Sequence, residues 1–237
     1  MPQEDDSARV VGADRVLAVL VELADHPGGI TLEDLALRLH SSKSTVHRAL
    51  TSLRKAGLAH QLGRGLYTLG DEFVRLAYRF QSQRPEGALI EPALHQLVAL
   101  YGETAHFAVR EASEVVYRAK VDPPEGGVRL TSTVGGRNPA HRTAVGKLLL
   151  SYSITTEAEL YDLVGTDPLP ARTEHSITSP RKLWEELQLI KKRGYAVDDQ
   201  ENELGINCVA VPVRWDLDSR PSSAVSVSAL ALSLIHI

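Results

Sequence analysis

Hydrophobic positions in the first 80 residues recur at helical spacing in three segments and then form two short extended runs. The helical segments cover residues 14–25, 31–39 and 43–57. Residues 58–62 and 66–69 are the extended runs, and the Gly-Arg-Gly between them is typical of a hairpin turn. This order predicts a helix-turn-helix followed by a β-hairpin wing.

After the wing, the pattern predicts a linking helix and a second domain. Residues 71–80 are amphipathic, with Phe73, Leu76 and Phe80 on one face that we expect to contribute to a dimer contact. The polar residues 82–87 mark a candidate boundary. The predicted division is a winged helix-turn-helix domain (10–70), a linker helix and hinge (71–87) and a second domain (88–237).

The second domain alternates between helical and extended patterns. The predicted order is a helix (88–101), three strands (104–110, 115–121 and 128–134), three helices (143–152, 157–164 and 180–193) and three more strands (195–198, 208–214 and 224–229). Helices set between two groups of strands are typical of an α+β domain. We expect one antiparallel sheet that is assembled from both halves of the domain.

Charge is distributed unevenly along the chain. The formal net charge is −4, and the 43% hydrophobic and 24% charged residues are ordinary for a globular protein. Between Leu35 and Gly70, however, six residues are basic and none is acidic. A basic segment in an otherwise acidic protein favours nucleic acid as its partner. A solvated charged surface is the alternative, although such a surface normally mixes both signs.

Several classes of protein do not fit the composition. No stretch reaches about 18 apolar residues, and no basic segment leads into an apolar run and a cleavage site. Cys208 is the single cysteine, which excludes an intrachain disulfide, and no Cys/His cluster has zinc-ligand spacing. We expect a cytoplasmic protein without a metal, a cofactor or a membrane partner.

The third predicted helix separates apolar from polar residues. One face carries the apolar residues Val46, Ala49, Leu50 and Leu53. The opposite face carries cations and hydroxyls, which suit phosphate oxygens and base edges in the major groove. The candidate DNA contacts are Lys43, Ser44, Thr45, His47, Arg48, Thr51 and Lys55 on this helix, and Arg64 at the tip of the wing. An ordinary amphipathic helix with a solvated face is the alternative.

Short motifs in the first 70 residues have a specific wording. The chain reads T-L-x-x-L-A from Thr31, K-S-T-V-H-R-x-L-x-x-L-x-x-A-G-L from Lys43, and Y-x-L-G from Tyr67. In these motifs it resembles the IclR (isocitrate lyase regulator) family of bacterial transcription regulators, and winged helices in general do not share them. Because a single winged helix covers only one half-site, we expect a homodimer or homotetramer that binds a palindromic operator in double-stranded DNA.

The resemblance continues to about residue 228. Residues 135–147, GGRNPAHRTAVGK, resemble the start of the central helix of the family's effector-binding domain, and residues 194–213 resemble the family signature. The resemblance implies a GAF-like or profilin-like fold that binds a small organic acid between the sheet and this helix. The effector positions carried over by motif are Ala144, Val145, Asp198, Cys208, Ser226 and Ser228.

These residue types make physical sense in a pocket. Ser226 and Ser228 are two apart on a strand, so their hydroxyls face the same side. The helix start near Thr143 offers unpaired backbone N–H groups to a carboxylate. The alternatives are a polar outer strand face for the serines, a loop or capping acid for Asp198, and a buried small hydrophobe for Cys208.

The chain departs from the family pattern at two places. Ala144-Val145 stands where the family usually has small residues, which predicts a narrower or more apolar pocket. Where the family commonly continues through a Gly-Pro turn into a last helix, residues 229–237 read ALALSLIHI. We expect a truncated C-terminus there, and a short terminal strand is the alternative. Arg142 and Lys147 either pair with an anionic ligand or face solvent.

The sequence therefore predicts a ligand-responsive transcription regulator of the IclR type, a repressor or an activator of a catabolic operon, and not an enzyme. Two other functions remain open. One is a winged-helix module that contacts proteins and does not bind DNA. The other is an enzyme with Cys208 as nucleophile and His141 or His175 as base. Against the enzyme, Cys208 lies in an apolar run without a helix start that would activate a thiolate.

Overall fold

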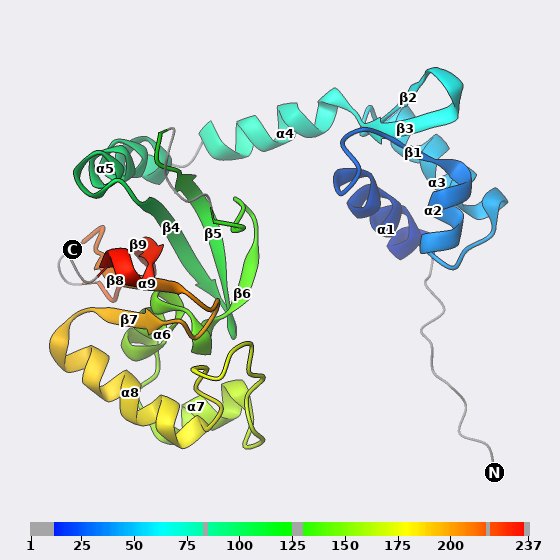
Figure 1. The fold of residues 1–237 in the computed structure, drawn as a ribbon. Coiled ribbons are helices and arrows are strands. Elements are labelled where there is room, and N and C mark those ends of the chain that lie inside the picture. Colours follow the sequence, from blue (N-terminus) through cyan, green and yellow to red (C-terminus); the bar gives the residue numbers. More distant parts are fainter. Residues whose placement is uncertain (1–11, 83–84, 125–129, 217–218, 235–237) are drawn as a thin grey trace, which may run out of the picture. The chain divides into compact units, whose positions relative to one another are not determined.

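The structure is a computed structural model that describes residues 12–82, 85–124, 130–216 and 219–234. The chain forms two compact units, Met1–Arg84 and Pro85–Ile237 (Figure 1). Within these described ranges, no helix combines the length and the apolar character that crossing a membrane requires.

The N-terminal unit is a winged helix-turn-helix. Its elements are α1 (Gly12–Ala24), β1 (Ile30–Thr31), α2 (Leu32–Arg38), α3 (Lys43–Lys55), β2 (Ala59–Leu62), the 3-10 turn η1 (Gly63–Gly65), β3 (Leu66–Leu69) and α4 (Asp71–Ser82). The predicted helices and hairpin are present. The two-residue strand β1 was not predicted, and it pairs with β3 so that the small sheet has the order β1-β3-β2.

Local sequence signals determine where these helices begin. The Thr31 hydroxyl accepts a hydrogen bond from the Asp34 amide at 3.1 Å, and the Ser42 hydroxyl caps α3 in the same way. Buried apolar residues of all three helices then pack against the hairpin. Gly70, at the end of the wing, lies against the backbone of Gly57. A Cβ at position 70 would lie 2.0 Å from the Gly57 carbonyl oxygen, so this close approach requires glycine.

The C-terminal unit is an α+β domain. Its elements are α5 (Pro85–Tyr101), β4 (Thr104–Glu111), β5 (Glu114–Val121), β6 (Arg137–Pro139), the 3-10 turn η2 (Ala140–Arg142), α6 (Ala144–Ser153), α7 (Glu157–Val164), α8 (Pro180–Arg193), β7 (Ala196–Asp199), β8 (Ile206–Val213), β9 (Ser223–Leu230) and α9 (Ala231–Leu234). The sheet order is β6-β5-β4-β9-β8-β7, with antiparallel pairing throughout. Strand β9 pairs with β4, which joins both halves of the domain as predicted.

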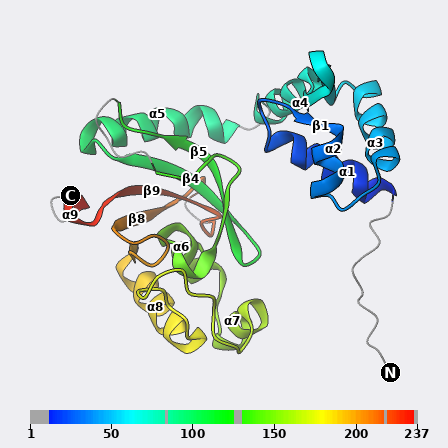
Figure 2. The same ribbon diagram turned by 45° about the vertical axis from the view of Figure 1, so that its right-hand side comes forward.

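Two hydrophobic layers cover the two faces of this sheet. Helix α5 packs on one face, and α6 with α8 packs on the other (Figure 2). Strand β4 supplies both layers, because Phe107 faces α5 while Ala108 faces α6. The same alternation places Ser226 and Ser228 of β9 on the face that α6 covers.

The predicted strand at 128–134 is wrong for residues 130–134, which form bends and a turn, and residues 128 and 129 lie outside the described ranges. The third strand is β6, which pairs with β5. A side chain explains the difference. The Lys120 ammonium donates hydrogen bonds to the carbonyl oxygens of Leu130 and Ser132 at 2.8 and 2.9 Å. These carbonyls therefore bind a lysine instead of a neighbouring strand.

The terminal segment also differs from the alternative of a short terminal strand. Strand β9 ends at Leu230, and Ala231–Leu234 forms the short helix α9. The Ala231 amide donates to the Gly205 carbonyl oxygen at 2.8 Å, which ties α9 to the turn between β7 and β8. Residues 235–237 lie outside the described ranges.

Candidate functional site

Helix α3 presents the polar face that the sequence analysis assigned to DNA. The four apolar residues predicted for its inner face are all buried. Five of the seven candidate contacts on this helix are exposed: Lys43, Ser44, His47, Arg48 and Lys55. Thr45 and Thr51 are half-buried. The helix therefore has one buried apolar side and one exposed side that is rich in cations.

Hydroxyls of the two threonines are already engaged within the helix. Thr45 Oγ1 lies 2.8 Å from the hydroxyl of the N-cap residue Ser42. Thr51 Oγ1 donates to the His47 carbonyl oxygen at 2.8 Å. A hydroxyl retains acceptor capacity after it donates. Contacts from these two residues to DNA would therefore share a hydroxyl with the helix. The same holds for the exposed Ser44, whose hydroxyl lies 3.0 Å from that of Ser42.

Ion pairs divide the basic segment into two groups. Arg38 lies 3.1 Å from Glu22 of α1, and Lys43 lies 2.6 Å from Glu33 of α2. Such exposed pairs contribute about 0–1 kcal/mol, so Lys43 can exchange its carboxylate for a phosphate at little cost. Among the described residues, the other α3 cations, which are Arg48, Arg54 and Lys55, have no ion-pair partner. The Arg64 side chain lies outside the part of the chain that the structure describes, although its backbone is at the tip of the wing.

The C-terminal unit contains a cavity of about 210 Å³ between the sheet and the start of α6. Its walls come from all six strands of the sheet and from the first turn of α6. The loops that precede β6, follow β7 and join α7 to α8 complete them. All six effector positions carried over by motif line this one cavity: Ala144, Val145, Asp198, Cys208, Ser226 and Ser228.

Strand register brings these residues together from distant parts of the sequence. Cys208 on β8 pairs with Asp198 on β7 and with Ser228 on β9. Ser226 pairs with His106 on β4. Both serines are 4% exposed, so neither belongs to a polar outer strand face. The floor of the cavity is a row of polar side chains inside an otherwise apolar layer.

Several of these polar groups lack strong partners. Ser226 is buried, and its hydroxyl forms no hydrogen bond with any described residue. Ser228 Oγ lies 3.5 Å from His106 Nδ1, and His106 Nε2 lies 2.8 Å from Ser132 Oγ. Burial, with a smaller effect of the Lys120 charge, lowers the pKa of His106 to about 4. The imidazole is therefore neutral at pH 7, with one donor and one acceptor nitrogen.

Helix α6 begins at the wall opposite the serines. Thr143 caps it, because its hydroxyl accepts a hydrogen bond from the Gly146 amide at 3.1 Å. The first-turn amides of Ala144 and Val145 have no intrahelical acceptor, and the helix dipole favours negative charge beside them. Gly146 permits the close packing behind this turn, because a Cβ would lie 2.3 Å from the Ala140 carbonyl oxygen.

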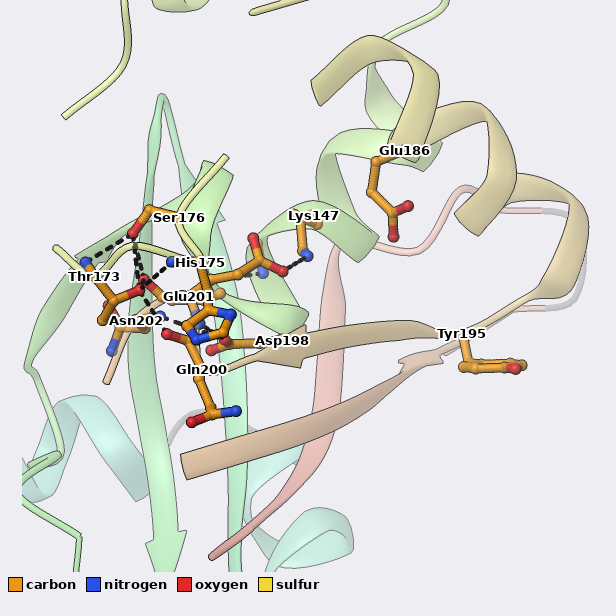
Figure 3. A network of polar contacts seen from close by, with 12 residues as sticks. Lys147, Thr173, His175, Ser176, Glu186, Tyr195, Asp198, Gln200, Glu201 and Asn202 are labelled. Atoms are coloured by element: carbon orange, nitrogen blue, oxygen red, sulfur yellow. Dashed lines mark hydrogen bonds and ion pairs between the residues drawn. The ribbon is translucent and has the colours of Figure 1, made fainter. Parts of the chain in front are cut away.

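Asp198 is the last residue but one of β7 and organises the turn that follows the strand (Figure 3). Its Oδ1 accepts hydrogen bonds from the amides of Glu201 and Asn202 at 2.7 and 3.3 Å. Within the turn, Gln200 has a φ of 60°, and Ser176 donates to the Glu201 carbonyl oxygen at 2.6 Å. Asp198 therefore caps the turn and also lines the cavity. Burial, together with the negative charge of Glu201, raises its pKa to about 7.

Lys147 forms a buried ion pair with Glu201 (Figure 3). Their exposed fractions are 1% and 6%. Glu201 Oε2 is buried without a hydrogen-bond partner, and burial raises the pKa of this carboxyl group against the opposing effect of Lys147. The expectation that Lys147 faces solvent or a ligand is therefore wrong. Arg142, by contrast, is half-buried and donates to the Asn202 side-chain oxygen at 3.0 Å.

The structure does not assemble a nucleophilic site around Cys208. Burial, with a contribution from Asp198, raises the pKa of the Cys208 thiol far above its usual range. His141 and His175 do not line the cavity, and His141 Nε2 lies 3.1 Å from the Pro170 carbonyl oxygen. A thiol that stays protonated is a poor nucleophile.

Sequence reasoning missed other residues of the cavity wall. They include His106, Tyr117, Ser132, Asn138 and Arg172. For His106 and Tyr117 a signal existed, because each alternates with apolar residues that face α5 on a predicted strand. Ser132 lies in the segment that was wrongly predicted as a strand. Asn138 and Arg172 lie outside the predicted strands and helices, and nothing in the periodicity indicated where they would lie.

Comparisons with known proteins assign both units to one family. Residues 12–63 match the IclR helix-turn-helix domain, and residues 87–235 match the family described as bacterial transcriptional regulator IclR C-terminal. The chain belongs to the IclR family. As an IclR-type protein it is a DNA-binding transcription regulator and not an enzyme. The predicted fold, a winged helix-turn-helix followed by an α+β domain, is confirmed.

Individual IclR relatives are similar over most of the chain. The transcriptional repressor IclR of Escherichia coli is 30% identical over 94% of this chain and 81% of its own length. The probable transcriptional regulator SauR of Cupriavidus necator is 33% identical over 93% and 85%. Among solved structures, the IclR protein of Thermotoga maritima has a TM-score of 0.75 and 29% identity, with 93% of this chain and 87% of that chain covered.

One further IclR structure was solved with a ligand. It is an IclR homologue from Microbacterium hydrocarbonoxydans complexed with 4-hydroxybenzoate, with a TM-score of 0.78 and 22% identity over 91% of this chain and 89% of that chain. At this identity the likeness concerns the fold.

Proposed function

We propose that this regulator responds to a small organic acid that binds in the cavity between α6 and the sheet. The single observation that carries the proposal is the Ser226 hydroxyl, which lines the cavity and has no hydrogen-bond partner among the described residues. A hydroxyl that lines a cavity and has no protein partner can bind a ligand or an ordered water. The 4-hydroxybenzoate complex of the Microbacterium homologue adds support for an organic acid.

Two walls of the cavity offer hydrogen-bond donors to the oxygens of a carboxylate. The amides of Ala144 and Val145 begin α6, where unpaired N–H groups and the helix dipole attract an anion. On the other side, Ser226 and Ser228 offer hydroxyl donors. Asp198 and Cys208 complete the proposed contact set. The controlled genes are then expected to include enzymes that consume this acid, which is the form that a catabolic operon takes.

The effector proposal is tested by thermal unfolding with a panel of small carboxylic acids that includes 4-hydroxybenzoate. An acid that binds only the folded protein stabilises it and so raises the unfolding temperature. At an acid concentration of a hundred times Kd, the free energy of unfolding increases by about 2.7 kcal/mol. The same acid should then change the affinity for operator DNA. Stabilisation by amines or neutral sugars, with none by acids, would contradict the proposal.

For DNA we propose that the exposed polar face of α3 enters the major groove and that Arg64 approaches the backbone from the wing. We expect Arg48→Ala to lower the discrimination between operator and unrelated DNA by about 1–3 kcal/mol, because Arg48 is exposed and has no ion-pair partner among the described residues. Gel-shift titrations with both DNAs measure this difference.

Arg181→Ala is the control for Arg48→Ala, since it removes another exposed arginine, from α8 of the other unit. An equal loss of affinity for operator and unrelated DNA would mean that Arg48 contacts only phosphates. Unchanged affinity on both would remove Arg48 from the DNA-facing side.

We also propose that the protein acts in the cytoplasm as a dimer or a pair of dimers on a palindromic operator, because one winged helix covers one half-site. The exposed apolar residues of α4 support a dimer contact there: Phe73, Leu76 and Phe80. Light scattering measures the state in solution, and a monomeric protein that binds its operator with full affinity would contradict this proposal.

The division into residues 10–70, 71–87 and 88–237 is likewise a proposal, supported by the clustering of contacts into two units that meet between Arg84 and Pro85. We expect limited proteolysis to cut first between residues 82 and 87 and to leave two resistant fragments. Mass spectrometry of the early products checks this expectation. Early cuts elsewhere, with residues 82–87 intact, would contradict the boundary.

A further inference from the structure

We propose that the cavity takes up one proton with each anionic effector and that Asp198 is the residue that holds this proton. The inference rests on the proposed organic-acid effector and adds a rule for when such an acid binds. Its basis is the arrangement of acids and bases around the cavity, where one buried acid has no base to balance it.

The first argument is the geometry of the Asp198 carboxyl group. Asp198 is 2% exposed and lines the cavity. Its Oδ1 accepts two backbone hydrogen bonds, from Glu201 and Asn202, while Oδ2 has no partner among the described residues. An ionised carboxylate only accepts hydrogen bonds, whereas a protonated carboxyl group can donate one. A proton on Oδ2 would let Asp198 donate to an oxygen of the bound acid.

The second argument is the balance of buried charge. Asp198, Glu201 and Lys147 are all less than a tenth exposed, which gives two acids and a single base. Lys147 is already bound to Glu201 (Figure 3). With Asp198 protonated the three groups are neutral overall, and with Asp198 ionised they carry an excess negative charge in a low-dielectric place. An anionic ligand would add a second negative charge beside the first.

Neighbouring groups do not neutralise this excess. Tyr117 of β5 and Cys208 of β8 face Asp198, and burial raises the pKa of Tyr117 to about 12 and that of Cys208 still further, so both are neutral. His106 of β4 is neutral as well. Glu203 of the turn and Glu186 of α8 add negative charge near Cys208 and Glu201.

Arg137 and Arg172 line the cavity and Arg142 lies beside it, and all three are more exposed to water than Asp198. Arg142 is half-buried and bound to Asn202, and Arg172 is exposed. Arg137 forms ion pairs with Glu111 and Glu114 of the sheet edge. Solvent screens such charges, so they attract an acid toward the cavity without cancelling the repulsion between two buried carboxylates.

The sign of the pH dependence follows. Burial and Glu201 raise the pKa of Asp198 to about 7, so the protonated form that accepts an anion is abundant below this pH and scarce above it. The apparent Kd rises as the competent fraction falls, by roughly 20-fold between about pH 6.5 and about pH 8.5. Small carboxylic acids stay ionised over this range, so their own titration does not contribute.

The test is calorimetric titration of the full-length protein with acetate, benzoate and 4-hydroxybenzoate. We expect the affinity of any acid that binds to weaken roughly 20-fold from about pH 6.5 to about pH 8.5. Repeating the titration near pH 8 in two buffers of different ionisation enthalpy should show uptake of nearly one proton. We expect Asp198→Asn to remove this pH dependence, because an amide does not titrate.

Asp199→Asn is the matched control, since it removes an adjacent but exposed carboxylate and should keep the full pH dependence. If Asp198→Asn does not fold, the proton uptake measured for the wild-type protein still decides whether a proton binds together with the acid. Binding that is independent of pH, or that strengthens as pH rises, would overturn this inference and leave the acid effector standing. Failure of all three acids to bind near pH 6 would overturn both.

Discussion

Replacing Lys147 with methionine is expected to lower the free energy of unfolding of the C-terminal unit by about 3–5 kcal/mol. Lys147 is 1% exposed and is bound to Glu201, which is itself buried. Methionine fills much of the same volume but leaves the Glu201 carboxylate without its cation. The remaining carboxylate must then either stay charged in an apolar place or take up a proton, and both alternatives destabilise the fold at neutral pH.

Denaturant unfolding of the variant and the wild-type protein measures this loss. Without its cation, the buried Glu201 has a higher pKa in the folded state than in the unfolded state. The destabilisation therefore grows as pH rises above the unfolded-state pKa, and it should shrink as pH falls. The double variant Lys147→Met, Glu201→Leu should recover most of the stability, since a buried pair is often replaceable by apolar residues. Lys191→Met, on the exposed side of α8, is the control. A loss of less than about 1 kcal/mol would contradict the buried pair.

The N-terminal unit could be predicted almost completely, because its structure depends on local signals. Thr31 and Ser42 begin their helices with side-chain caps, and the apolar spacing of the next residues defines the buried face of each helix. The strand β1 escaped prediction, because it has only two residues and exists through its pairing with β3. A two-residue strand is too short to have a period.

The cavity shows which part of a site sequence can predict. Its six predicted positions came from the resemblance to a family, and strand register then placed them around one space. Lys147 was misjudged because its partner, Glu201, is 54 residues away in the sequence. Residues 130–134 were misjudged because the Lys120 side chain binds their carbonyl oxygens. Both errors concern single long-range polar contacts, which leave no periodic pattern.

The double variant Ser226→Ala, Ser228→Ala is expected to lose the response to the effector while it keeps its affinity for operator DNA. Two hydrogen bonds to the bound acid would disappear, each of about 0.5–1.5 kcal/mol. Together they are comparable to the coupling of about 1–3 kcal/mol that normally links an effector site to a second site. No residue of α3 is changed, so DNA binding without the acid should not alter.

Stability separates this prediction from a trivial loss of folding. Because the Ser226 hydroxyl has no hydrogen bond with any described residue, its replacement by alanine breaks no hydrogen bond within the described part of the protein. The ligand-free Ser226→Ala single variant should therefore unfold at the same temperature as the wild-type protein or above it, which is the pattern of a residue retained for binding. Ser228→Ala also removes the contact with His106, so the stability of the double variant is compared with that of each single variant. Ser226→Val should bind still more weakly than Ser226→Ala, because it adds bulk to the cavity. Ser222→Ala, at an exposed position just before β9, is the control and should leave the response intact. Calorimetry with an acid that stabilises the wild-type protein decides the question, since equal affinities for the wild-type protein and the double variant would remove both serines from the effector site.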